Sequence, residues 1–216
     1  KLDSAPLWNR WGNGRTNARF QPYNDSKISD HNVSSLKLKW AFGFPGATRA
    51  RSQPAVTAEA IFTGSQDGTV YALDTQTGCV WWTFKAEAEV RSAISIDVDN
   101  AGKPQRLYFG DFKANVYSLN AQTGELLWKK KVDDHPVATI TGSLTLHDGR
   151  LFVPVSSTEV VNAFDPAYGC CTFRGGIAAL DGEKGEFLWR MYTVPEAVKQ
   201  GKNSKGVQLW GTSGAP

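Results

Sequence analysis

The sequence predicts an all-β protein built from repeated blades, and one recurring motif carries that prediction. The motif is a small residue, Leu and Asp or Asn, then three residues, Gly, three residues and Trp; it occupies residues 72–82, 118–128 and 179–189. A degenerate fourth copy, residues 36–40, also ends in Trp. The 8 Trp and 21 Gly suit a turn-rich β protein, and the 10 Pro argue against a helical bundle.

The spacing of the motif predicts the architecture. The closing residues are Trp40, Trp82, Trp128 and Trp189, so the steps between them are 42, 46 and 61 residues. A period of roughly 40 to 50 residues, with short strands and Gly turns, is typical of β-propeller blades. About four blades do not close a ring of six to eight. We therefore expect a piece of a larger propeller, with a further blade beginning at Trp210.

The parts of each repeat have local reasons. In the first copy an apolar strand over residues 70–73 runs into Asp74-Thr75-Gln76-Thr77-Gly78, where Asp caps the turn and Gly accepts a positive φ. We expect the next strand to end at Trp82, a large anchor for a neighbouring blade. Cys79, inside this hairpin, is expected to be a small buried side chain.

In chain order, we expect an N-terminal arm over residues 1–35 and the propeller over residues 36–216. The third blade carries about 15 extra residues, which we place in a loop over residues 156–168. Inserted loops on a repeated scaffold are common places for function. A helical turn is expected over residues 195–199. The expected strands of the three blades cover residues 53–56, 60–64, 91–96, 106–110, 139–144 and 150–155.

Composition excludes some classes of function. The net charge is +3, and the run Lys129–Lys131 lies at a strand end, so no nucleic-acid surface is expected. No run of 18 apolar residues occurs, so no membrane span is expected. The start, Lys1-Leu2-Asp3, does not resemble a signal peptide and is expected to be internal. The three His residues, His31, His135 and His147, lack zinc-site spacing.

Three features could carry chemistry. Cys170 and Cys171 are adjacent; they form either a rigid disulfide plate beside a ligand or two reduced thiols. Arg51 and Arg91 hold equivalent positions in successive blades, where they either bind an anion in one shared channel or solvate strand ends. Glu159 follows three hydroxyl residues in the inserted loop, which suits Ca²⁺; the alternative is an exposed loop carboxylate.

Together these residues resemble the quinoprotein alcohol dehydrogenases, eight-bladed propellers that hold pyrroloquinoline quinone (PQQ) and Ca²⁺ on the axis. The likeness covers nearly the whole chain and is closest to the members that act on polyvinyl alcohol. It implies about half of an eight-bladed ring, with tryptophan-docking blades. The segments that carry it are residues 11–14, 77–82, 170–175 and 210–216.

The resemblance also implies a site. The implied PQQ contacts are Arg91, Thr141, Ser156, Cys170, Cys171 and Arg174, and the implied Ca²⁺ ligand is Glu159. Two features depart from the methanol-type members: the cysteine pair follows Glu159 instead of preceding it, and Arg51, or nearby Gln53, stands where they carry Glu. The catalytic Asp base of the family matches no residue of this chain.

The implied function is PQQ- and Ca²⁺-dependent oxidation of secondary alcohols in the periplasm, with electrons passed to a cytochrome c. This chain alone is expected to be inactive. The rival is a non-catalytic scaffold propeller of the outer-membrane assembly type, which should lack the adjacent cysteines and the Ser-x-x-Glu loop. A third alternative, a decayed quinoprotein that binds no cofactor, is the one that Arg51 would support.

Overall fold

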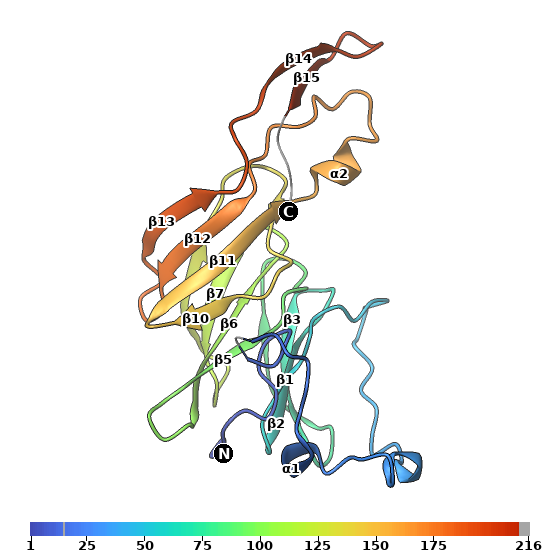
Figure 1. The fold of residues 1–216 in the computed structure, drawn as a ribbon, viewed down its shortest axis with the longest axis vertical. Helices are drawn as coiled ribbons and strands as arrows, with labels where there is room; N and C mark the ends of the chain where they lie inside the picture. Colours follow the sequence, from blue (N-terminus) through green and yellow to red (C-terminus); the bar gives the residue numbers. More distant parts are fainter. Residues whose placement is uncertain (15, 212–216) are drawn as a thin grey trace.

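Three antiparallel blades make up most of the molecule (Figure 1). The computed structural model describes residues 1–14 and 16–211. The first blade holds β1 (Ala55–Val56), β2 (Ala60–Gly64), β3 (Thr69–Asp74) and β4 (Val80–Lys85). The second holds β5 (Ser95–Val98), β6 (Pro104–Gly110), β7 (Asn115–Asn120) and β8 (Leu126–Lys131). The third holds β9 (Ala138–Thr139), β10 (Thr145–His147), β11 (Arg150–Ser157), β12 (Gly176–Asp181) and β13 (Phe187–Tyr192).

Strands follow chain order within each blade, as the hairpin motifs predict. In the third blade, β9 pairs with the end of β11 instead of continuing β10. The central strands β3 and β7 are almost wholly buried, whereas the last strands β4 and β8 are largely exposed. Two apolar cores result, one between the first and second blades and one between the second and third. Burial of large apolar side chains there, at about 1.5–3 kcal/mol each, holds the blades together.

Tryptophan docking joins each blade to the next. The Trp82 indole lies against Gly124 in the turn of the second blade, and its Nε1 donates to the Ala121 carbonyl oxygen at 3.3 Å. A Cβ on Gly124 would come within 2.5 Å of this ring, so glycine is required there. The arrangement recurs for Trp40 with Gly78 and the Thr75 carbonyl (3.0 Å) and for Trp128 with Gly185 and the Gly182 carbonyl (3.2 Å).

The N-terminal arm is tied across the first two blades. Trp8 forms an isolated antiparallel bridge with Val56. The Asn9 side chain pairs with both backbone groups of Ile96, donating to its oxygen at 2.8 Å and accepting from its nitrogen at 2.9 Å. The arm therefore fixes the inner edges of two blades relative to each other. Its helical turns are α1 (Tyr23–Ser26) and η1 (Val33–Ser35).

Several local predictions differ from the structure. Of the strands expected over residues 91–96 and 139–144, only Ser95, Ile96 and Thr139 lie in strands, because β5 and β10 begin later in the chain. The strand that carries Trp82 does not end there but continues to Lys85, because it stays paired with β3 as far as Thr69. Residues 36–40 form no strand, although Trp40 docks like its counterparts. Cys79 is exposed and not buried, because it follows the turn on the outer edge of the blade.

A hairpin replaces the expected helical turn over residues 195–199. It consists of β14 (Val198–Lys202) and β15 (Gln208–Gly211) and extends beyond the third blade in Figure 1. The antiparallel backbone pairing of β14 with β15 stabilises the extended conformation there, and this outweighs the weak helical preference of the sequence. Residues 212–216, where the next blade is expected to continue, lie outside the described residues. No helix of the described residues is long and apolar enough to cross a membrane.

Candidate functional site

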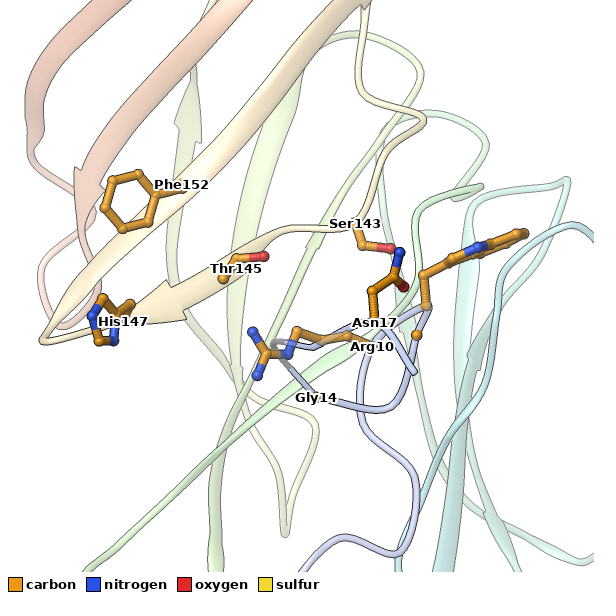
Figure 2. A pocket seen from close by; sticks show the side chains of 9 residues that line it. Arg10, Gly14, Asn17, Ser143, Thr145, His147 and Phe152 are labelled. Atoms are coloured by element: carbon orange, nitrogen blue, oxygen red, sulfur yellow. The ribbon is translucent and has the colours of Figure 1, made fainter. Parts of the chain in front are cut away.

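A cavity of about 310 Å³ lies between the arm and the third blade, with Arg10 and Asn17 on its arm side (Figure 2). Phe152 of β11 lines the other side. Phe62 of the first blade and Tyr108 of the second blade hold the position equivalent to Phe152. Both are fully buried, because the next blade covers them. The cavity is therefore the uncovered face of the third blade and not a ligand site in its own right.

A second cavity, of about 720 Å³, lies where the inner segments of all three blades begin. We call it the arginine cavity. It brings together three of the predicted cofactor contacts, Arg91, Thr141 and Ser156. The remaining lining residues are Arg49, Arg51, Phe112, Thr139, Ser157, Thr158 and three residues of the short helix α2 (Glu159–Asn162), namely Val160, Val161 and Asn162.

Arg91 is held by its own neighbours. Its Nη2 donates a hydrogen bond to Glu89 Oε2 at 2.9 Å. Its Nε lies 2.8 Å from Glu89 Oε1; this contact is an ion pair, but its angle is not that of a hydrogen bond. Its guanidinium also stacks on the Phe112 ring, 4.0 Å from the centroid. The two charged side chains are only 21% and 14% exposed. Arg91 is therefore rigid, and its charge is already compensated.

Arg49 and Arg51 differ from Arg91. Both are exposed at the cavity, and neither makes an ion pair or a side-chain hydrogen bond within residues 1–14 and 16–211. In that same part of the chain, no Asp or Glu lines the cavity. Two uncompensated positive charges thus face a cavity that bears no carboxylate of its own.

The third blade contributes hydroxyl groups. Thr141 Oγ1 and Ser156 Oγ lie 3.3 Å apart, and Ser156 Oγ also donates to the Thr139 carbonyl oxygen at 3.4 Å. Thr139 is 2% exposed, and its Oγ1 has no hydrogen-bond partner among the described residues. Buried hydroxyl groups are normally paired. The cavity is suited to an anion that also accepts hydrogen bonds.

Glu159 lies behind this lining, at the base of α2, and is 3% exposed. Its Oε1 accepts from Tyr168 Oη at 2.9 Å and from Thr172 N at 2.8 Å, and its Oε2 accepts from Phe173 N at 3.0 Å. Burial of Tyr168, together with its hydrogen bond to the Glu159 carboxylate, raises the pKa of Tyr168 to about 12. The carboxylate holds the inserted loop against the segment that follows it.

This arrangement of Glu159 does not fit a Ca²⁺ ligand. Ca²⁺ takes six to eight oxygens, while three protein donors already occupy this buried carboxylate. The described residues contain no group of three or more His, Cys, Asp or Glu that could hold a metal ion. The metal role of Glu159 stays a prediction from the resemblance.

The other predicted contacts lie outside the arginine cavity. Cys170 and Cys171 form a disulfide, and their backbone pairs with Trp210 of β15 at 2.7 and 3.0 Å. Arg174 stacks on the Tyr192 ring at 3.9 Å and donates to the Val194 carbonyl oxygen. Their cofactor roles stay predictions.

Sequence reasoning missed Arg49, Phe112 and Thr139 of the cavity, and it placed Val160, Val161 and Asn162 only within the inserted loop. A signal for Arg49 and Thr139 was available. Arg49 precedes Arg51 by two residues, and Thr139 precedes Thr141 by two, which is the spacing that places side chains on one face of an extended segment.

Comparison with known proteins agrees with these features. Residues 24–205 match the PQQ-repeat family model, which carries the description "Outer membrane protein assembly factor BamB". The chain belongs to the PQQ-repeat family. Polyvinylalcohol dehydrogenases of Pseudomonas sp and of Sphingopyxis sp. (strain 113P3) are 42% and 41% identical to this PQQ-repeat chain over 216 residues, which is 99% of it. The predicted resemblance to quinoprotein alcohol dehydrogenases is thereby confirmed.

Solved structures confirm the propeller fold of this PQQ-repeat protein. Quinohemoprotein alcohol dehydrogenase ADHIIG from Pseudomonas putida HK5 matches 93% of the chain with a TM-score of 0.72 at 24% identity, over 28% of its own length. The enzyme from Comamonas testosteroni matches 87% of the chain with a TM-score of 0.69 at 21% identity, over 27% of its own length. The chain spans about a third of the two polyvinylalcohol dehydrogenases, 33% and 32%.

Proposed function

We propose that this chain forms one wall of the cofactor site of a PQQ-dependent alcohol dehydrogenase. The observation that carries the proposal is the arginine cavity, where three arginines and several hydroxyl groups from successive blades meet without a lining carboxylate. PQQ is a planar tri-acid, so it needs cations and hydrogen-bond donors around its edge. The names of the relatives support the same enzyme class.

The residues of this chain would bind and orient the cofactor. Arg91, which Glu89 and Phe112 hold in place, presents a rigid edge, and the hydroxyl groups of Thr141 and Ser156 lie beside it. When bound, PQQ supplies the two-electron acceptor for alcohol oxidation. Val160 and Val161 of α2 would offer the cofactor an apolar surface on one side of the cavity.

The finer parts of the proposal rest on the family resemblance. We propose a secondary alcohol as substrate, including a polymeric one such as polyvinyl alcohol, which two relatives are named for. We also propose a cytochrome c as electron acceptor and Ca²⁺ as a second cofactor, and the assignment of Glu159 to that ion rests on the resemblance alone. A periplasmic location agrees with the Cys170–Cys171 disulfide, because disulfides persist in oxidising compartments.

The test uses the full-length parent protein, freed of cofactor and titrated with PQQ in the presence and absence of Ca²⁺. Binding is read from quinone absorbance, and turnover from dye reduction with a secondary alcohol. Saturable binding that weakens in Arg91→Ala supports the site, and loss of the Ca²⁺ response in Glu159→Ala supports the metal role. A well-folded parent that binds no PQQ refutes the enzyme assignment.

The rival function is a non-catalytic scaffold propeller. The description of the matching family model, an outer membrane protein assembly factor, supports this rival. A scaffold needs the blades but no cavity with uncompensated arginines. The PQQ titration therefore distinguishes the two functions, because only the enzyme should bind PQQ. An absence of PQQ binding, together with turnover that stays at background, leaves the scaffold as the better account.

A further inference from the structure

We propose that the β14–β15 hairpin is a docking element for an acidic protein surface. One face of the hairpin carries Lys199, Lys202 and Trp210, and Lys205 lies in its turn. The partner that fits this face is a protein that presents a compact group of Asp or Glu carboxylates. The face lies outside the arginine cavity and does not involve the cofactor assignment.

A β-bulge brings the two lysines of β14 to the same face. Lys199 is paired with Trp210, and its ammonium lies 5.7 Å from the centroid of that ring. Lys202 is paired with Gln208, because the register shifts between Lys199 and Gly201. Directly opposed residues share a face, and so do residues two apart in one strand, which places both lysines beside the indole. Without the bulge, two lysines three residues apart would point to opposite faces.

Contacts at its base and in its turn hold the hairpin in place. The Trp210 backbone pairs with Cys170 and Cys171 at 2.7 and 3.0 Å. In the turn, Asn203 Nδ2 donates to the Pro166 carbonyl oxygen of the inserted loop at 2.8 Å. The lysines are therefore displayed on a fixed support that projects beyond the third blade (Figure 1). A preorganised face loses less conformational entropy when a partner binds.

The positive charge of the hairpin is not compensated within the chain. Lys199, Lys202 and Lys205 are exposed. In the part of the chain that the structure describes, none of them makes an ion pair or a side-chain hydrogen bond. Residues 197–211 contain no Asp or Glu. Such a cluster attracts carboxylates and speeds the association of an oppositely charged partner.

Neighbouring acidic residues favour a compact partner over an extended polyanion. Glu196 precedes β14, and Asp165 adjoins Pro166, which the turn contacts. A nucleic acid or an anionic membrane spreads its charge over a large area and would meet these carboxylates. A small acidic patch on a folded protein avoids them. The Trp210 indole also suits such a contact, because Trp is enriched in protein–protein interfaces.

The experiment measures binding of poly-L-glutamate to the full-length parent protein, and this binding should weaken as the salt concentration rises. Lys199→Gln/Lys202→Gln should raise the Kd by about threefold to tenfold, the effect of losing two exposed ion pairs. The matched control, Lys37→Gln/Lys130→Gln, removes two exposed lysines elsewhere and should change the Kd by less than about twofold.

Val198→Lys/Lys199→Gln separates the face from the net charge, because it moves one lysine to the opposite face and keeps the total charge. Val198 is 56% exposed, so the hairpin should keep its fold. This variant should also bind more weakly than the parent; equal binding would mean that net charge alone matters and would overturn the proposal. Tighter binding of a short DNA duplex or of phosphatidylglycerol vesicles than of poly-L-glutamate would overturn it too. A parent that binds no poly-L-glutamate at low salt would show that the face is covered, with the same consequence.

Discussion

Removal of one docked tryptophan should uncouple two blades. In Trp82→Ala the indole that fills the space above Gly124 disappears, together with the hydrogen bond to the Ala121 carbonyl oxygen. Buried Trp→Ala changes cost about 3–5 kcal/mol. Trp82 is only partly buried, so we expect a loss near the lower end, about 3 kcal/mol, of which the hydrogen bond supplies about 1 kcal/mol.

Trp189 provides the matched comparison. It closes the third copy of the motif but is 42% exposed, and its ring contact is with Phe152 of its own blade at 6.0 Å. Trp189→Ala should therefore cost about 1 kcal/mol in this chain, the value of an aromatic pair. In a longer chain that carries the following blade, the same change should cost as much as Trp82→Ala.

Urea unfolding of this chain, followed by far-ultraviolet circular dichroism, measures both losses. A double-mutant cycle sharpens the test: Trp82→Ala should relieve much of the clash that Gly124→Ala creates, so the two changes should not be additive. Equal losses in Trp82→Ala and Trp189→Ala, or additive effects in the cycle, would refute the docking argument.

Three further predictions concern individual side chains. Burial opposes ionisation of Asp67, but hydrogen bonds from Lys85 and Ser65 outweigh it and lower its pKa, so its contribution to stability is present above about pH 4 and lost as the pH falls. Asp67→Asn should flatten the dependence of the urea midpoint on pH below about pH 5, and an unchanged slope would contradict this. Cys79 should react with one equivalent of a thiol reagent in the native protein, since it is exposed and the other two cysteines form a disulfide. The variant Cys79→Ser should not react, and any labelling left in it would disprove the assignment. Glu159→Gln turns an amide donor toward groups that already donate, so it should cost about 1–3 kcal/mol in urea unfolding, whereas an unchanged midpoint would show that the carboxylate does not anchor the loop.

The repeating parts of the fold could be predicted because their causes are local in sequence. The Asp74 side chain accepts from Gln76 N at 2.9 Å and Thr77 N at 2.7 Å, so the turn is built by residues within four positions of one another. The motif Trp recurs at the same place after each turn. Its docking onto the next blade follows from periodicity alone, even for Trp40, which lies in no strand.

The candidate site could be predicted only in part. The equivalent positions of Arg51 and Arg91 in successive blades correctly place both at one cavity. The equivalence could not show that Arg91 pairs with Glu89 while Arg51 has no such partner among the described residues, because this pairing depends on side-chain direction. Glu159 shows the same limit: its loop position suggests an available ligand, while the structure turns it inward toward Tyr168 and two backbone donors.

The sequence by itself determined the all-β class, the blade period, the turn chemistry and the family of this protein. All of these depend on short-range hydrogen bonding or on regular spacing along the chain. The tertiary structure alone decided that Arg51 faces the cavity uncompensated and that Thr139 is buried without a partner. It also decided that Glu159 holds the inserted loop. Those properties depend on which distant groups meet, because charge compensation and burial arise only when separate blades pack together.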